Sequence, residues 1–201
     1  MKIYFEYGEK EINYLSKKDK KLGAAIEGIG MLERAVNCDP FSALVESVVG
    51  QQISTKAAAT VCGRLRDLCG VDFDAVRLDA LSLEEIKACG MSFQKAGYIK
   101  NIAEAAASNA INFATLHEKT DEEIIQILTG IKGVGVWTAE MLLIFSLMRP
   151  DVISYGDLAI RRGMMRLYGL KELPKEQFAK YAKRYSPYAS VASLYLWRIS
   201  D

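Results

Sequence analysis

The sequence feature that most constrains the fold is a glycine-rich turn between two apolar helical patterns, at residues 121–148. An amphipathic run follows the acidic residues 121–123, which is typical of a helix N-terminus. The turn, GIKGVG at 130–135, has three glycines in six residues, and a second apolar pattern follows it until shortly before Pro150. The sequence therefore predicts a helix, a tight hairpin and a second helix.

A glycine-rich turn that opens a helix is suited to binding a phosphate group. Its backbone N–H groups have no partner within the helix, no Cβ hinders close approach, and the helix dipole favours negative charge. Because such binding carries no base information, it would hold DNA or RNA without reading its sequence. The alternative is a helix–helix corner that binds nothing. A Walker loop is excluded because no Gly-Lys-Ser/Thr follows, and a Rossmann turn is disfavoured because no apolar strand precedes.

An acidic residue, Asp157, follows the predicted hairpin and its second helix. Twenty residues after Trp137, the segment SYGD at 154–157 precedes another helical pattern. Asp157 stands where a helix N-cap is expected, and capping is its structural interpretation. The functional interpretation is a carboxylate at a helix start, facing the hairpin, that stabilises a cationic transition state or activates water. The residues by themselves leave both interpretations open.

These motifs resemble a known family. GIKGVGVWTAEM at 130–141, followed by GDLAIRR at 156–162, is similar to the helix-hairpin-helix DNA glycosylase superfamily, and within it to the 3-methyladenine DNA glycosylase II branch. Three further segments match that branch in the family's order: VVGQQISTKAAATVCGRL at 48–65, GMSFQKAGYIKNIAEAA at 90–106 and YSPYASVASLYLW at 185–197.

The resemblance implies an all-α fold of two helical lobes with an active-site cleft between them. The central lobe would comprise roughly residues 50–150, and the second lobe residues 1–49 with 151–201. About 35 residues precede the matching region, so the longer N-terminal β-rich domain of full-length members is expected to be absent or vestigial.

Hydrophobic periodicity agrees with a helical chain. Residues 2–7 alternate as a short strand would, and from Asp19 onward the pattern is helical nearly throughout. Gly70, Gly90, Gly130 and Gly169 stand where helix ends are expected. We expect helices near 19–28, 40–49, 54–70, 74–80, 82–88, 93–108, 112–115, 121–128, 136–148, 157–169, 174–184 and 187–200.

Composition excludes several classes of protein. The 201 residues are 50% apolar and 25% charged, as in globular domains with a substantial core. No apolar run approaches the roughly 18 residues of a membrane span, and the N-terminus has no signal-peptide h-region. We therefore expect a cytoplasmic, nucleoid-associated protein without a membrane partner. The net charge of +1 lacks the basic excess of many DNA-binding proteins, although basic clusters occur at 17–21, 161–166 and 180–184.

The cysteine and histidine content argues against a metal site with side-chain ligands. Cys38, Cys62, Cys69 and Cys89 contain no CxxC pair, and three of them lie in apolar helical surroundings, which favours buried free thiols. Endonuclease III-like members of the superfamily carry a C-terminal four-cysteine motif, so we expect no iron–sulfur cluster here. His117 has no second His or Cys nearby, which disfavours zinc.

The resemblance also implies a reaction. The partner would be double-stranded DNA with damaged bases, bound by a monomer that flips the damaged nucleotide out of the duplex. Asp157 would be the catalytic carboxylate that stabilises the oxocarbenium-like sugar. Bifunctional members have a nucleophilic lysine at the position of Trp137, so the resemblance implies a monofunctional hydrolase without lyase activity.

The base pocket would be aromatic, because alkylated purines are cationic and stack well on electron-rich rings. Trp197 is the first candidate, Trp137 is a further one, and Tyr155 and Tyr188 are weaker. Packing in a helical core is the alternative for each. Met141 and Ala159 stand where relatives carry larger side chains, which suggests a wider pocket.

The DNA contacts would come from two turns. The hairpin would contribute Gly130, Lys132, Gly133, Val134 and Gly135. The turn at 50–54 would contribute Gln51 and Gln52, with Gln52 filling the space that the flipped base leaves; the alternative is that both glutamines cap the following helix. No cofactor would be required, although the carbonyls of Thr129, Ile131 and Val134 could hold a structural Na⁺ or K⁺.

Two other functions compete with this one. Helix-hairpin-helix units often serve as non-catalytic DNA-binding modules, and the superfamily also contains endonuclease III and adenine-mismatch types. The position of Asp157 and the additional matching segments disfavour the first, and the cysteine pattern and Trp137 disfavour the second. A purely structural helical domain is the remaining alternative.

Overall fold

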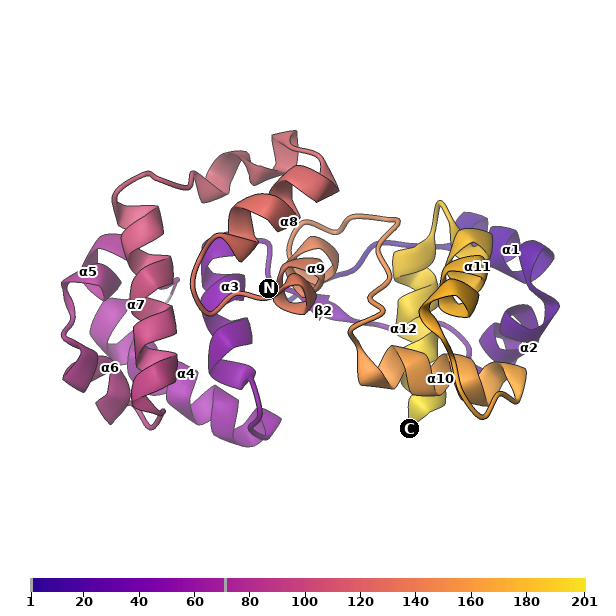
Figure 1. Ribbon diagram of the computed structural model, residues 1–201, viewed down its shortest axis with the longest axis horizontal. Coiled ribbons are helices and arrows are strands. Elements are labelled where there is room, and N and C mark those ends of the chain that lie inside the picture. The colour runs from indigo at the N-terminus through magenta and orange to yellow at the C-terminus, as the bar shows by residue number, and fades with distance from the viewer. Residues whose placement is uncertain (1, 71) are drawn as a thin grey trace. The chain divides into compact units, whose positions relative to one another are not determined.

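The computed structural model describes residues 2–70 and 72–201, and nearly all of its regular structure is helical (Figure 1). Two short strands, β1 (Ile3–Tyr4) and β2 (Ala35–Val36), pair antiparallel with Ile3 opposite Val36. The helices are α1 (Glu9–Lys18), α2 (Lys20–Ile29), α3 (Pro40–Gly50), α4 (Thr55–Cys69), α5 (Ala75–Ala80), α6 (Leu83–Ala88), α7 (Phe93–Ala107), the 3-10 helix η1 (Phe113–Glu118), α8 (Asp121–Thr129), α9 (Val136–Phe145), α10 (Leu158–Tyr168), α11 (Lys175–Tyr185) and α12 (Ala189–Ser200). The predicted all-α class is confirmed.

The chain divides into two compact units. The first joins residues 1–36 to residues 143–201, and the second consists of residues 37–142. We expected boundaries near 50 and 150, which would have separated α3 from the middle of the chain. The structure places α3 in the second unit because its apolar side packs on α4, α7 and η1.

Unit 37–142 is organised around the buried helix α3. Phe41, Leu44, Val45, Val48 and Val49 of this helix are all buried. Burial of five such side chains contributes about 1.5–3 kcal/mol each relative to exposure. The helix begins with an Asp39 N-cap and Pro40 in its first turn, a combination that satisfies free N–H groups and presets the helical backbone.

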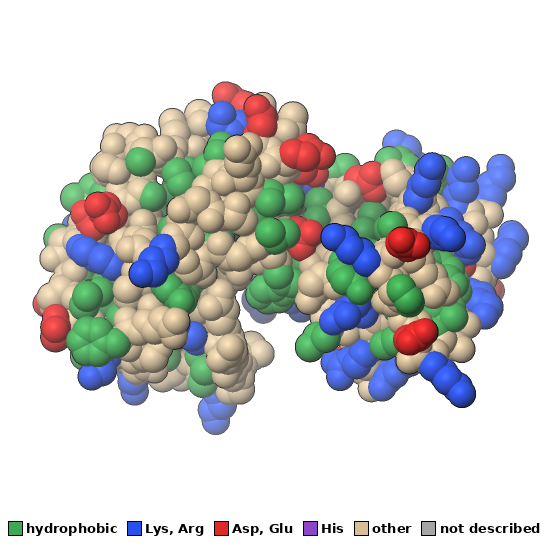
Figure 2. Space-filling model, in the orientation of Figure 1, with side chains coloured by type: hydrophobic (Ala, Val, Ile, Leu, Met, Phe, Trp, Pro, Cys, Tyr) green, Lys and Arg blue, Asp and Glu red, His purple; other side chains and the backbone are tan. Residues whose placement is uncertain are grey.

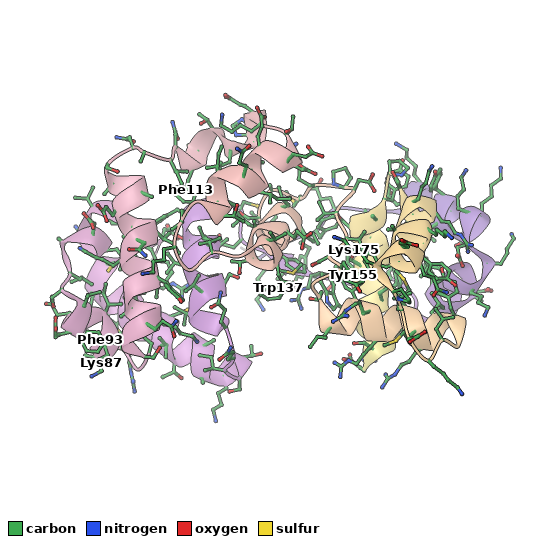
Figure 3. The ribbon with its side chains drawn as sticks, viewed as in Figure 1. Lys87, Phe93, Phe113, Trp137, Tyr155 and Lys175 are labelled. Carbon is green, nitrogen blue, oxygen red and sulfur yellow. The ribbon has the colours of Figure 1, made fainter. Side chains whose placement is uncertain are left out.

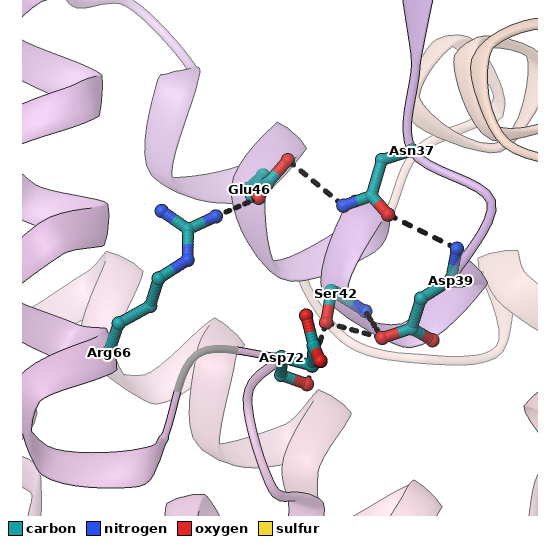
Figure 4. A network of polar contacts seen from close by, with 6 residues as sticks. All are labelled: Asn37, Asp39, Ser42, Glu46, Arg66 and Asp72. Carbon is teal, nitrogen blue, oxygen red and sulfur yellow. Dashed lines mark hydrogen bonds and ion pairs between the residues drawn. The ribbon is translucent and has the colours of Figure 1, made fainter. Parts of the chain in front are cut away.

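A polar network fixes the start of α3 to its neighbours (Figure 4). The Ser42 hydroxyl donates to the backbone carbonyl of Asp72 at 2.9 Å, and the Asn37 amide donates to Glu46 at 3.3 Å. Glu46 also pairs with Arg66 of α4. The network therefore joins α3 to α4 and to the turn before α5.

Unit 1–36 with 143–201 is centred on α12, which is buried along most of its length. Gly163 of α10 lies so close to it that a Cβ at this position would stand 2.0 Å from the carbonyl oxygen of Leu196. The N-terminal segment packs on the same helix, since the Tyr195 hydroxyl donates to the Gly30 carbonyl at 3.1 Å and contacts the Tyr7 hydroxyl at 3.2 Å. Helix α10 is thus held against α12 by direct backbone contact.

The structure differs from the predicted elements at a few places. Helix α1 was missed because its sequence is polar and Leu15 is its one fully buried residue. The strand predicted over residues 2–7 is only two residues long. Helix α9 ends at Phe145, three residues before the predicted end at Met148, which has a left-handed φ of 50°. The glycine helix ends are confirmed; Gly70 and Gly169, for example, adopt φ of 92° and 70°. Within the described part of the chain, no helix has the length and apolarity that a membrane crossing requires.

Candidate functional site

The predicted hairpin joins α8 to α9 within unit 37–142. Its first helix is fixed by a capping box, in which Thr120 Oγ1 accepts from the Glu123 N–H at 3.2 Å and the Glu123 carboxylate accepts from the Thr120 N–H at 2.8 Å. In the turn, Ile131 and Val134 are buried, and the Val134 N–H donates to the Ile131 carbonyl at 3.0 Å. The hairpin is therefore anchored by its two apolar side chains.

The remaining hairpin residues include those predicted to contact DNA. Gly130, Lys132 and Gly135 are exposed, whereas Gly133 is half-buried. Gly135 directly precedes α9, whose first N–H groups have no acceptor one turn back in the helix. An exposed glycine before a helix N-terminus has the chemistry of a phosphate site, and DNA binding by these residues stays a prediction.

Helix α7 packs against the hairpin. Gly133 has φ of 106°, and a Cβ added there would stand 2.2 Å from Cγ of Tyr98. The Asn101 side-chain amide donates to the Lys132 carbonyl at 3.1 Å. Tyr98 and Asn101 lie three residues apart on α7 and therefore on one face. Sequence reasoning did not assign them a role, because only the tertiary packing of α7 on the hairpin reveals it.

The first turns of α9 carry two of the predicted pocket residues. Trp137, the second residue of the helix, is 39% exposed, so it is not a buried core residue (Figure 3). Met141, one turn later, is buried with 7% of its surface exposed. The structure thus exposes the tryptophan at the start of α9 and buries the methionine one turn later.

The turn at 50–54 belongs to the same unit. Gln52 is exposed and adopts a left-handed φ of 59°, unusual for a residue other than glycine. The Gln51 amide donates to Thr138 of α9 at 3.4 Å. Ser54 caps α4 through its hydroxyl, which accepts from the Ala57 N–H at 3.3 Å. The alternative in which the two glutamines cap this helix is therefore wrong.

Lys95 fastens that turn to α7. Its ammonium donates to the Val49 carbonyl at 2.9 Å and to the Gln51 carbonyl. Burial lowers the pKa of Lys95 below its ordinary value. Two carbonyls on either side of Gly50 are thus drawn to one cation, which fixes the exit from α3. Sequence reasoning did not identify this lysine, since its contacts are 44 and 46 residues distant.

Asp157 lies in the other unit and is buried, with 7% of its surface exposed. Its Oδ1 accepts from the N–H groups of Ala159 at 2.8 Å and Ile160 at 2.9 Å. The predicted N-cap at the start of α10 is confirmed. The two hydrogen bonds hold the carboxylate in one orientation, which is the requirement for a fixed charge in a reaction centre. Its catalytic role stays a prediction.

Two of the predicted pocket aromatics belong to the same unit as Asp157: Tyr155, two residues before it, and Trp197 of α12. The ring of Tyr155 packs edge-on against Phe178 at 5.2 Å, and the Arg161 guanidinium lies 5.1 Å from the Tyr155 centroid (Figure 3). Trp197 is half-buried and lies 5.3 Å from Phe145 at a tilt of 33°. Phe145 is therefore an aromatic neighbour of this ring, which remains partly accessible.

Tyr188, one of the weaker aromatic candidates, makes an ordinary packing contact. The ring of Tyr188 meets Tyr14 of α1 edge-on at 5.2 Å. This contact favours the packing interpretation for Tyr188. Ala159, the other position noted for its small side chain, is half-buried in the first turn of α10 and donates its N–H to Asp157.

The predicted site residues thus fall into two sets, one in each compact unit. The hairpin, the turn at 50–54, Trp137 and Met141 are together in unit 37–142, whereas Asp157, Tyr155 and Trp197 are together in the other unit.

The cysteines are free thiols, as predicted. Cys62, Cys69 and Cys89 are buried and Cys38 is exposed. Burial raises the pKa of the Cys69 thiol to about 11 and raises the pKa values of the other two buried thiols. Among residues 2–70 and 72–201, no group of three or more His, Cys, Asp or Glu is arranged to hold a metal ion.

Comparison with known proteins agrees with these features. Residues 45–187 match the HhH-GPD superfamily of base excision DNA repair proteins. The chain is 37% identical over 166 residues to DNA-3-methyladenine glycosylase 1 of Schizosaccharomyces pombe, covering 81% of this chain and 73% of the relative. It is 28% identical to DNA-3-methyladenine glycosylase 2 of Escherichia coli, covering 88% of this chain and 62% of the relative.

Solved structures show the same fold. The crystal structure of a DNA-3-methyladenine glycosidase from Bacillus halodurans superposes with a TM-score of 0.87 at 36% identity, over 98% of this chain and 92% of that one. The S. pombe 3-methyladenine DNA glycosylase Mag1, solved in complex with abasic DNA, superposes with a TM-score of 0.83 at 32% identity, over 94% of this chain and 95% of that one.

Proposed function

Because the chain belongs to the HhH-GPD superfamily of base excision DNA repair proteins, we propose that it is a monofunctional DNA glycosylase. Its reaction is hydrolysis of the N-glycosidic bond of alkylated purines of the 3-methyladenine type, after base flipping. The similarity to DNA-3-methyladenine glycosylases over most of the chain supports the substrate class. The abasic DNA in the Mag1 complex supports DNA as the partner, since an abasic site is the product of this reaction.

The observation that carries the proposal is the fixed carboxylate of Asp157 at the N-terminus of α10. Departure of the base leaves positive charge on the sugar, which a nearby carboxylate stabilises. The same group orients and deprotonates the attacking water. Because the N–H groups of Ala159 and Ile160 already hold it, little reorganisation is needed when that charge develops.

The chain hydrolyses without nicking the strand. A lyase needs an amine to attack the sugar and form a Schiff base, and Trp137 offers only an indole at the position where bifunctional relatives have lysine. Lys132 lies in the hairpin with its carbonyl held by Asn101, and its exposed ammonium is suited to a phosphate. We therefore assign it to DNA binding.

Aromatic side chains select the substrate. Alkylation at N3 or N7 makes a purine cationic, and stacking on an aromatic ring contributes about 0.5–2 kcal/mol for a cation. Trp197 and Trp137 are both partly exposed and are the two rings that we assign to this contact. Met141 and Tyr155 complete the set of proposed pocket residues.

The hairpin binds the DNA backbone, and its carbonyls also suit a monovalent cation. The donor set fits because the Ile131 carbonyl, which accepts one N–H from Val134, retains a second lone pair. Together with the carbonyls of Thr129 and Val134 it would offer neutral oxygen ligands to Na⁺ or K⁺. Such an ion would supply positive charge for a DNA phosphate.

A base-release assay tests the proposal. The protein is incubated with duplex DNA that has been methylated by an alkylating agent, and the released bases are identified by mass spectrometry. We expect free 3-methyladenine or another methylated purine from the native protein and about 10²-fold slower release, or slower still, from Asp157→Asn. Retention of the DNA without any release would instead indicate a non-catalytic binding module.

A further inference from the structure

A second cationic site lies on the unit of residues 1–36 and 143–201, where α1 and α2 meet α10 and α11. A surface depression of about 340 Å³ is lined by Lys18, Asp19, Lys20, Lys21, Tyr168, Tyr181 and Arg184. A second depression of about 390 Å³ continues from it along α11, and the two share Tyr181 and Arg184. We call the first depression the lysine–tyrosine groove.

The net charge of the whole chain is close to zero, but this unit by itself is strongly basic. It contains 17 Lys and Arg against 11 Asp and Glu, which gives a net charge of +6. Unit 37–142 contains 9 against 14, which gives −5. Figure 2 shows Lys and Arg side chains gathered over the part of the molecule that contains α10 and α11.

The one acidic residue that lines the groove, Asp19, is already hydrogen-bonded and ion-paired by neighbouring residues. Asp19 is buried, caps α2 through the N–H groups of Lys21 and Leu22, and accepts a hydrogen bond from the Tyr168 hydroxyl at 2.6 Å. Arg184 donates to the same oxygen, Oδ2, at 3.3 Å. Its negative charge is therefore balanced within the groove and does not offset the three lysines.

The three lysines of the groove have no acidic partner among the described residues. Lys18, Lys20 and Lys21 are all exposed, and none of them forms an ion pair with a described residue. Lys18 and Lys21 lie near the rings of Tyr14 and Tyr168, at 5.5 Å and 5.8 Å, which orients their ammonium groups without neutralising them.

The aromatic rings indicate which part of a nucleic acid fits. Tyr168 and Tyr181 stack on each other at 3.9 Å with an angle of 12° between the rings. Arg184 lies 5.0 Å from the Tyr181 centroid, and Lys21 occupies the region over Tyr168. Because these ring faces already have neighbours, the groove is unsuited to stacking unpaired bases and suited to phosphate groups.

We propose that the lysine–tyrosine groove binds the sugar–phosphate backbone of duplex DNA, as a contact additional to the hairpin. The identity of this polyanion rests on the proposed function, because a protein that acts on duplex DNA meets its backbone at every encounter. The contact is independent of sequence and of damage. It retains the protein on undamaged DNA during the search for a lesion.

The test is the binding of an undamaged 30-base-pair duplex, followed by fluorescence anisotropy as a function of salt. Lys18→Gln, Lys20→Gln and Lys21→Gln are combined in one variant, and Asp19 and Arg184 are left intact to preserve the fold. The matched control removes three exposed lysines of the same unit outside the groove: Lys2→Gln, Lys10→Gln and Lys171→Gln. Both variants therefore have the same net charge.

We expect the groove variant to weaken binding about 10- to 100-fold near 0.1 M salt and to lower the slope of log K against log salt by about 3. The control should change affinity less than about 3-fold. Equal weakening in both variants would overturn the proposal in favour of a general field, and no weakening in the groove variant would overturn it outright. Undamaged DNA is used, so the result can be read even if the protein proves not to release bases.

Lysine acetylation mapped by mass spectrometry provides a second readout. Duplex DNA should protect Lys18, Lys20 and Lys21 from acetylation while Lys2 and Lys171 remain reactive. Protection by polyglutamate but not by DNA would show that the groove binds an acidic protein segment and would refute the DNA assignment.

Discussion

Gly133 lies directly against the ring of Tyr98, at a distance that leaves no room for a side chain. A Cβ at this position would stand 2.2 Å from Cγ of Tyr98, and the backbone already has a φ of 106° that L-residues rarely adopt. The hairpin therefore needs glycine here for two independent reasons, conformation and contact. At Gly135, by contrast, no atom lies within 4 Å of an added Cβ.

Gly133→Ala should destabilise the fold and disturb the hairpin. We expect the free energy of unfolding to fall by about 2 kcal/mol or more, which lowers Tm by about 4 to 8 °C for a chain of this size. The measurement is thermal unfolding followed by circular dichroism. Gly135→Ala is the matched control: Tm should change little, while affinity for DNA falls because the added methyl group hinders the phosphate. Equal Tm values for the two variants would contradict the steric argument.

Asp157→Asn should separate chemistry from stability. Asparagine caps a helix about as well as aspartate, so we expect Tm to stay within about 1 °C of the native value. Loss of the negative charge should slow base release about 10²-fold or more in single-turnover assays on methylated duplex DNA. Asp157→Ala should show the same loss of rate and lose a further ~1 kcal/mol of stability with the cap. Near-normal release by the Asn variant would remove Asp157 from the mechanism.

The absence of an amine at residue 137 predicts the form of the product. After base release, the DNA strand should stay intact until alkali or heat breaks it at the abasic site, as shown on a denaturing gel. Borohydride added during the reaction should trap no protein–DNA adduct, because Trp137 forms no Schiff base. A bifunctional glycosylase assayed in parallel gives the positive control. A trapped adduct would mean that a lysine such as Lys132 performs the attack.

The hairpin could be predicted from the sequence because glycine spacing and apolar periodicity are local signals. Asp157 was identified as a cap from its place before a helical pattern, and the structure confirms that. The residues that support these features could not be predicted. Tyr98 and Lys95 act through packing and carbonyl contacts with segments distant in sequence, and their own helix pattern is the same with or without those contacts. Helix α1 was missed for a related reason, because Leu15 alone does not create a periodic apolar face.

Thiol reactivity should distinguish Cys38 from the other cysteines. Cys38 is exposed, whereas burial raises the pKa of the Cys69 thiol to about 11 and also raises the pKa values of Cys62 and Cys89, so thiolate is scarce at pH 8. We expect Ellman's reagent to modify one thiol of the native protein quickly and the other three only after unfolding. Cys38→Ser should abolish the fast phase. More than one fast thiol in the native protein would contradict the burial of the other three.

Asp19 should contribute to stability in a pH-dependent way. Burial alone raises the pKa of this carboxyl, but hydrogen bonds from Tyr168, the Leu22 N–H and Arg184 outweigh burial and hold the pKa below its ordinary value. A group whose pKa is lowered on folding stabilises the fold above its unfolded pKa, and this contribution is lost as the pH falls through the folded value. Urea unfolding at pH 6, 4 and 3 should therefore show a smaller loss of stability on acidification in Asp19→Asn than in the native protein. Glu172→Gln, at an exposed position, is the control and should leave the acid dependence unchanged.

The discontinuity of one unit has a consequence for how the protein is made. Its N-terminal portion, residues 1–36, packs with residues 143–201, which leave the ribosome only after residues 37–142. Residues 37–142 are complete well before that point and can fold while the first segment still lacks its partners. The apolar residues of α2 that pack on α10 and α12 therefore stay exposed on the nascent chain until residues 143–201 have been made, and chaperone contact during translation should concentrate on those first residues.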